Sequence, residues 1–83
     1  MEKELITADW LREQGFTETD FDDKHFKKQI GERIMDIHQD NISLAWTFSC
    51  FSDEKWRAAG LRYNSGTGLR YQKELKNLAP SFF

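Results

Sequence analysis

The feature of this 83-residue chain that most constrains its fold is the alternation of apolar and polar residues around Asp40-Asn41. This dipeptide fits a two-residue hairpin turn. Pairing around the turn places Ile37 opposite Leu44. It also places Met35 opposite Trp46, and all four apolar side chains then share one face. The sequence therefore predicts two antiparallel strands joined at this turn.

The segment from Phe26 to His38 also fits a helix, because apolar residues recur in it at helical spacing. These residues are Phe26, Ile30, Ile34 and Ile37. The hairpin favours the strand, since a helix gains nothing from the coincidence of apolar faces. We expect residues 25–30 to add a further strand, with Gly31 at a bulge or turn. The strand count depends on this segment.

A polar stretch at residues 52–55 predicts a second hairpin turn. In that register Phe48 lies opposite Ala59, and the strand after the turn continues the apolar face. The predicted apolar face consists of Met35, Ile37, Leu44, Trp46, Phe48, Ala59, Leu61 and Tyr63, with Cys50 at its edge.

Two helices flank these strands. Thr7 is a favourable N-cap for a helix over about Ala8 to Gln14, and Gly15 is a favourable stop. Near the other end, residues 64–68 are rich in glycine and serine and predict a break in regular structure. A second helix follows, with Tyr71, Leu75 and Leu78 at helical spacing before Pro80.

The expected fold is a single α+β domain over residues 1–83, in the order α-β-β-β-β-α, with an antiparallel meander sheet and both helices on one of its faces. The chain has 14% aromatic residues, including three Trp and seven Phe, which is enough apolar mass to fold without disulfides. No apolar run is long enough to span a bilayer or to form a signal peptide, so we expect a cytoplasmic protein without a membrane partner.

Residues that would indicate catalysis are not arranged in a known pattern. Cys50 is the only cysteine, which excludes an internal disulfide and a cysteine-based zinc site. His25 and His38 have no third ligand at metal spacing, and we expect them to face solvent. The acidic stretch 18–23 lacks the features of a calcium loop, and Gly66-Thr67-Gly68 lacks those of a nucleotide loop. We expect no enzyme activity, no cofactor and no metal.

The predicted register also defines the other face of the sheet. Its floor would be small, consisting of Ser43, Ala45, Thr47, Ser49, Ala58 and Gly60. Its rim would be Ile34, His38, Phe51, Trp56 and Arg62. Because Trp and Arg are favoured anchors of protein interfaces, this rim is a candidate protein-binding face. Alternatively, the Phe82-Phe83 tail or the residues around Phe21 and Phe26 cover it.

A second candidate surface is the basic side of the last helix, formed by Arg70, Lys73 and Lys76. The net charge of −2 divides unevenly, since residues 1–40 are acidic and residues 41–83 basic, a split that also fits charge complementarity between packed segments. The glycine loop at 66–68 followed by residues 72–79 resembles the end of double-stranded RNA-binding domains. That resemblance implies that Gln72, Lys73 and Lys76 contact phosphates, although Gln72 carries no charge.

The two ends of the chain resemble those of small α+β proteins of bacterial phages and prophages. The similarity covers Thr7-Ala8-Asp9-Trp10-Leu11 with Gly15-Phe16, and the segment from Tyr71 to Leu78. It implies a non-enzymatic module, an inhibitor or adaptor, that binds a host protein. The alternatives are binding of duplex RNA by the last helix, and formation of a homodimer through the open sheet face or a strand edge.

Overall fold

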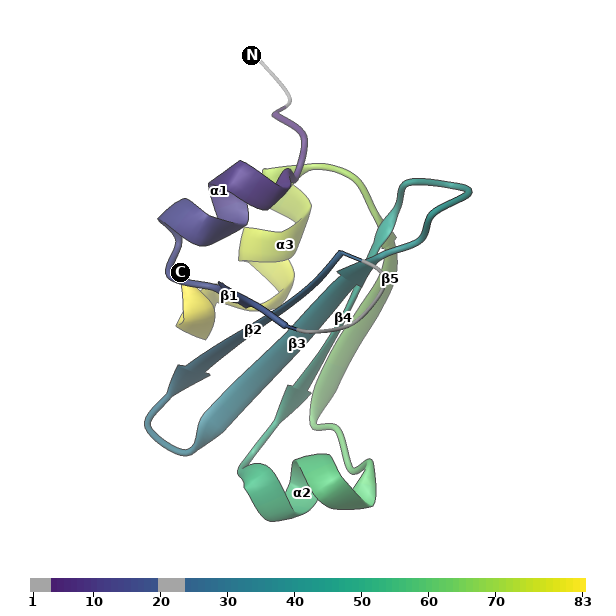
Figure 1. Cartoon of the computed structure of the whole chain (residues 1–83). Helices are drawn as coiled ribbons and strands as arrows, with labels where there is room; N and C mark the ends of the chain where they lie inside the picture. Colours follow the sequence, from purple (N-terminus) through teal and green to yellow (C-terminus); the bar gives the residue numbers. More distant parts are fainter. Residues whose placement is uncertain (1–3, 20–23) are drawn as a thin grey trace.

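The computed structural model describes residues 4–19 and 24–83. Within them, a five-stranded antiparallel sheet has the meander order β1-β2-β3-β4-β5 (Figure 1). The strands are β1 (Thr17–Glu18), β2 (His25–Ile30), β3 (Arg33–Gln39), β4 (Trp46–Phe51) and β5 (Asn64–Leu69). The helices are α1 (Ala8–Glu13), α2 (Glu54–Ala59) and α3 (Gln72–Leu78), followed by the 3₁₀ turn η1 (Pro80–Phe82). The predicted α+β fold class is confirmed, with β1 and α2 as additions.

Helix α1 begins and ends as the sequence predicts. The Thr7 hydroxyl accepts a hydrogen bond from Trp10 N at 3.1 Å, which satisfies one of the free amides of the first turn. Gly15 has a φ of 91°, and Phe16 N then donates to Leu11 O at 3.0 Å. The chain folds back at this point, so that Leu11 and Phe16 enter the same core.

The hairpin between β3 and β4 has the predicted faces and a different register. Ile37 lies opposite Phe48 and Met35 opposite Cys50, four positions along from the predicted pairs. The turn is longer because residues 40–45 form a loop, in which Asp40 N donates to Ala45 O and Leu44 N donates to Asp40 O. An even shift keeps each side chain on its original face. Leu44, predicted for the core, is exposed in this loop.

The predicted strand after residue 55 is wrong, because residues 54–59 form helix α2. Asp53 caps it by accepting a hydrogen bond from Trp56 N, and Gly60 closes it with a φ of 72°. Ala59, Leu61 and Tyr63 are therefore exposed rather than part of the apolar face.

The last strand is β5, in the segment predicted to be a break. Gly66 lies opposite Phe48, and a Cβ atom at Gly66 would come within 2.6 Å of the Phe48 ring. The glycine therefore marks a close approach of backbone to ring rather than the end of regular structure.

Helices α1 and α3 lie on one side of the sheet (Figure 1). The core between them and the sheet consists of Ile6, Trp10, Leu11, Phe16, Phe26, Met35, Ile37, Trp46, Phe48, Cys50, Leu69, Leu75, Ala79 and Phe82. Leu78, predicted for the buried stripe of α3, is exposed, and Leu75 and Ala79 take the core positions. The Phe83 ring stacks on Trp10 with a centroid separation of 5.4 Å. The Phe82-Phe83 tail thus covers the helix side and leaves the other face open.

Candidate functional site

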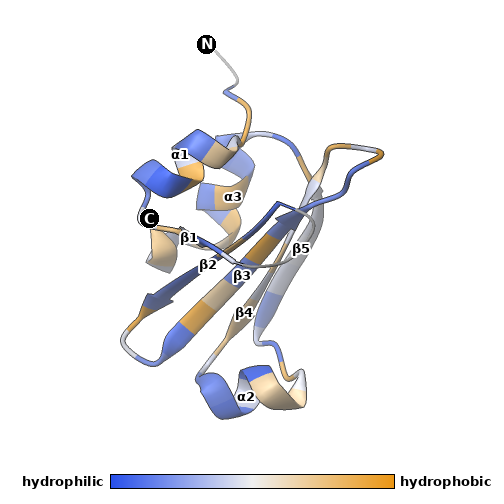
Figure 2. Cartoon of the chain, in the orientation of Figure 1, coloured by the Kyte–Doolittle hydropathy of each residue, from blue (hydrophilic) through white to orange (hydrophobic). Residues whose placement is uncertain are grey.

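The open face of the sheet is mostly polar. Asp36 and His38 of β3 lie on it opposite Ser49 and Thr47 of β4, and the apolar pair Ile34 and Phe51 occupies one end. Figure 2 shows hydrophilic and hydrophobic bands along β3. Thr47 and Ser49 lie on it, as predicted for the floor, and the Thr47 and Thr67 hydroxyls are hydrogen-bonded at 2.9 Å. The other predicted floor residues lie elsewhere: Ser43 in the hairpin loop, Ala45 buried beside it, Ala58 in α2 and Gly60 at the end of α2.

The predicted rim is only partly assembled. Ile34 and Phe51 are opposite each other on the open face, but α2 contacts β3 and β4 there, and the two side chains are 0% and 7% exposed. His38 is exposed near the other end of β3. Phe26 and Phe82, two of the predicted covering residues, are in the core on the other side, and Phe21 is outside the described residues. Only Trp56 and Arg62 come together.

Trp56 and Arg62 line one open hollow where α2 meets the start of β5. Leu61 and Tyr63 are the other large side chains that line it, and we call these four residues the α2–β5 corner. Gly60, Asn64 and Ser65 also line it. Trp56, Leu61 and Tyr63 are 39%, 54% and 43% exposed. The hollow thus presents three large apolar side chains and one guanidinium to solvent.

The local sequence explains this arrangement. Gly60 adopts the left-handed conformation after α2, which allows Leu61 N to donate to Trp56 O at 2.8 Å. The reversal brings residues 61–63 back beside Trp56. Asp53 before the helix and Gly60 after it were the signals for α2, and they identify Leu61 and Tyr63 as site residues that the strand prediction assigned to the core.

An ion pair ties α2 to the open face. Arg57 Nε donates to Asp36 Oδ2 at 2.9 Å, and Arg57 Nη1 donates to Glu54 at 3.2 Å. The hydrogen bond to Asp36 raises the pKa of Arg57 above its usual range. Asp36 Oδ1 is buried and has no hydrogen-bond partner within the described part of the chain. The ion pair fixes the helix that carries Trp56.

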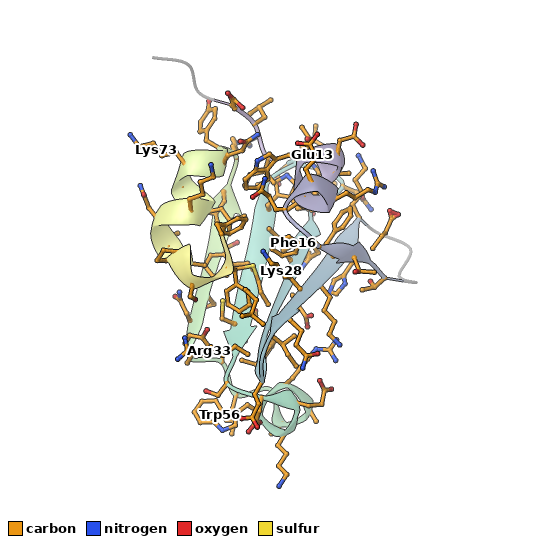
Figure 3. The ribbon with its side chains drawn as sticks, turned by 90° about the vertical axis from the view of Figure 1, so that its left-hand side faces the viewer. Glu13, Phe16, Lys28, Arg33, Trp56 and Lys73 are labelled. Carbon is orange, nitrogen blue, oxygen red and sulfur yellow. The ribbon has the colours of Figure 1, made fainter. Side chains whose placement is uncertain are left out.

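One cation lines the corner, and two more are exposed near it. Arg62 Nη1 is 3.5 Å from Ser49 Oγ, and Arg33 and Lys55 are exposed nearby in sequence or space. Figure 3 shows Arg33 and Trp56 toward the same end of the molecule. Across residues 4–19 and 24–83, none of these three cations forms an ion pair. The corner therefore favours a ligand with negative charge as well as apolar surface.

Lys73 and Lys76 of α3 lie on a separate surface. Arg70, predicted for the same helix face, lies before the N-cap Tyr71 and is not part of the helix. All three residues are exposed, and Figure 3 shows Lys73 directed away from the sheet. Lys76 Nζ lies 5.8 Å from the centroid of Trp10, and Gln72 Nε2 donates to Leu5 O. Both contacts join α3 to the N-terminal part of the same chain. The resemblance to RNA-binding domains stays a prediction.

The other candidate groups do not form a site. His25 and His38 lie opposite each other, with ring centroids 6.2 Å apart, but no group of three or more metal-binding side chains occurs among the described residues. Burial raises the pKa of Cys50 to about 11, which disfavours the reactive thiolate. Residues 20–23 of the acidic stretch lie outside the described residues.

Comparison with known proteins gives no relative: no protein-family model matches the chain, and neither a curated protein nor a solved structure is significantly similar to it. In the part of the chain that is described, no helix has the length and apolar character needed to cross a membrane.

Proposed function

We propose that this chain is a non-enzymatic protein-interaction module, acting as an inhibitor or adaptor, whose binding surface is the α2–β5 corner. The observation that carries the proposal is the exposure of Trp56 beside Leu61, Arg62 and Tyr63 in one hollow. The other two tryptophans, Trp10 and Trp46, are buried. Trp, Tyr and Arg are the residues most enriched at binding hot spots.

The energetic argument concerns surface left in water. Burial of a large apolar side chain stabilises a protein by about 1.5–3 kcal/mol. Three large apolar side chains in this hollow stay partly in contact with water after folding. A partner that covers them therefore gains the free energy of burying that remaining surface. The rigid turn at Gly60 and the Asp36–Arg57 ion pair hold the hollow in place, which lowers the ordering cost of association.

The charge around the corner indicates the charge of the partner surface that would bind there. Arg33, Lys55 and Arg62 are exposed cations, so the preferred partner surface is acidic with an apolar centre. Such a surface accelerates association at low salt and loses that advantage as ions screen it.

The test is affinity capture from bacterial lysate with tagged chain, with and without nuclease. We expect one protein to be captured at near-stoichiometric level regardless of nuclease, and Trp56→Ala to abolish the capture. Ile30→Ala, which truncates another exposed apolar residue that does not line the hollow, should retain it. Circular dichroism of each variant reports the fold.

Capture that survives Trp56→Ala would contradict the proposal. Recovery of RNA-associated proteins that disappear with nuclease would instead direct attention to Arg70, Lys73 and Lys76, and Lys73→Glu would then reduce binding.

A further inference from the structure

The two edges of the sheet differ in protection. The edge strand β1 has two residues, and its Glu18 forms an ion pair with Arg12. The edge strand β5 has six residues with no charge and no proline. Among the described residues, the backbone hydrogen bonds of β5 belong to its ladder with β4. Charge, proline and short length are among the means by which proteins prevent edge pairing, and β5 has none of them. The ladder with β4 has a register shift between the Phe48–Gly66 and Trp46–Leu69 pairs, so the regular part of this edge is residues 64–66.

The end of β5 opposite the corner is flanked by an apolar protrusion. Leu69 pairs with Trp46, so this end lies beside the loop at residues 40–45, which Figure 1 shows extending outward beyond the strand. Ile42 and Leu44 in this loop are 93% and 58% exposed. We call residues 40–45 the hairpin tip.

The hairpin tip is held in one conformation at some cost. Leu44 has a φ of 62°, a conformation that is strained for a residue with a bulky side chain. Hydrogen bonds keep it there: Leu44 N donates to Asp40 O, and Gln39 Nε2 donates to Leu44 O. A strained, fixed and exposed apolar loop has the properties of a preformed anchor.

The hairpin tip and the α2–β5 corner are complementary in shape and in charge. The tip protrudes and carries Asp40, whose side chain accepts a hydrogen bond from Ser43 N and forms no ion pair among the described residues. The corner is hollow and carries Arg62. They lie at opposite ends of the same unprotected strand.

We propose that this chain forms a homodimer in which the β5 strands of two copies pair antiparallel and each hairpin tip docks in the α2–β5 corner of the other copy. Antiparallel pairing about a two-fold axis sets the Leu69 end of one strand against the Asn64 end of its partner. It therefore brings tip to corner twice, and each copy gives and receives the same contact. The inference rests on the proposed function, because it uses the same corner: a second copy occupies the corner in the free protein, and another partner binds there by displacing that copy.

The second copy is favoured over an unrelated strand by three features. The small side chains Ser65, Gly66, Thr67 and Gly68 bring no like charges together when β5 pairs with itself. The apolar residues at the two ends match, and Asp40 of one copy meets Arg62 of the other. A standard interface buries about 800 Å² per partner, which is roughly one seventh of the 5565 Å² surface of this chain.

The test is sedimentation equilibrium of the full chain from about 1 µM to about 1 mM. We expect the mass to rise toward twice the 9.9 kDa of the chain. Ile42→Asp and Ser65→Lys should each raise the dissociation constant at least about tenfold, the first through the tip and the second through the edge strand where it borders the hollow. Ile30→Asp changes another exposed isoleucine and should leave the constant unchanged. Circular dichroism confirms that each variant is folded.

A charge exchange tests the tip–corner contact itself. Asp40→Lys alone and Arg62→Glu alone should be monomeric, because each would place like charges at both contacts. An equimolar mixture of the two variants should form a heterodimer, in which both contacts again join opposite charges.

Monomer mass at all concentrations overturns the dimer, as does a dimer that is insensitive to Ile42→Asp and Ser65→Lys. These results are distinguishable from failure of the proposed function. If wild-type chain is monomeric while Trp56→Ala still abolishes capture of another protein, the corner remains the binding site and its occupant is not a second copy.

Discussion

The two faces of the sheet are built from the same strands and have opposite roles. On the covered face, Phe26, Met35, Ile37 and Phe48 are fully buried beneath α1 and α3. On the open face, the intervening residues are polar except for Ile34 and Phe51, which lie at the end that α2 shields. This difference indicates that burial on the covered face supplies most of the stability of the fold. The open face and the corner beside it are therefore free to carry binding residues.

The largest expected effect is the difference in stability loss between substitutions at two neighbouring residues of β4, one on each face. Phe48→Ala should lower the free energy of unfolding by about 3–5 kcal/mol, because it removes a fully buried ring and leaves a cavity. Thr47→Ala, on the open face, removes one exposed hydrogen bond and should cost below about 1 kcal/mol. Urea denaturation of both variants measures the difference, and equal losses would contradict the assignment of roles.

A second substitution tests how tightly β5 packs on the covered face. A methyl group at Gly66 would come within 2.6 Å of Phe48 Cε1, so Gly66→Ala should destabilise by about 1–3 kcal/mol through overpacking. Ser65→Ala in the same strand adds no atom and should lie within about 0.5 kcal/mol of wild type. Phe48→Leu in the Gly66→Ala background should recover part of the loss. Full stability of Gly66→Ala would show that β5 can move away from β4.

The third prediction concerns the shielded end of the open face. Arg57→Met removes the partner of Asp36 Oδ2, and Asp36 Oδ1 already lacks one among the described residues, so a largely buried carboxyl group would lose its ion pair. We expect a loss of about 1–2 kcal/mol in thermal or urea unfolding. Lys55→Met, an exposed neighbour in α2, serves as the control. The variant Asp36→Asn combined with Arg57→Met should be more stable than Arg57→Met alone, and the opposite order would contradict the assignment.

The sequence predicts faces better than it predicts registers, for a physical reason. Alternation has a period of two, so the four-residue shift between the predicted partner of Ile37 and its observed partner Phe48 leaves every strand residue on its face. Loop length is set by local hydrogen bonds and by the left-handed conformation of Leu44, which a leucine rarely adopts. The sequence pattern contains no signal for it.

Only part of the site was predicted, because helix and strand periodicities overlap over short segments. Residues 59, 61 and 63 alternate as a strand would, and the strand prediction rested on that pattern alone. The cap at Asp53 and the stop at Gly60 are the signals that indicate the helix instead. Trp56 and Arg62 still share a surface, because Gly60 reverses the chain between them. Ile34 and Phe51 do not, because the unpredicted helix covers them.

The smallest expected effect is a change in stability with pH, and it comes from His25 on the open face. Partial burial lowers the pKa of His25 below its usual value near 6.5. The charge of Asp36 opposes the shift, and His38 and Arg57 add to it. Because the folded state then binds a proton less readily than the unfolded state, the contribution of His25 to stability is complete above about pH 6.5 and is lost as the pH falls through its folded pKa.

We expect urea midpoints to decline slightly between about pH 7 and pH 5, and His25→Gln to flatten part of that decline. The Thr19 hydroxyl contacts His25 Nδ1 at 2.7 Å, and glutamine keeps a polar group able to reach it. His38→Gln, on the exposed partner residue, is the matched control and should change the slope less. A decline with pH that is the same in wild type and in His25→Gln would contradict the assignment of the effect to His25.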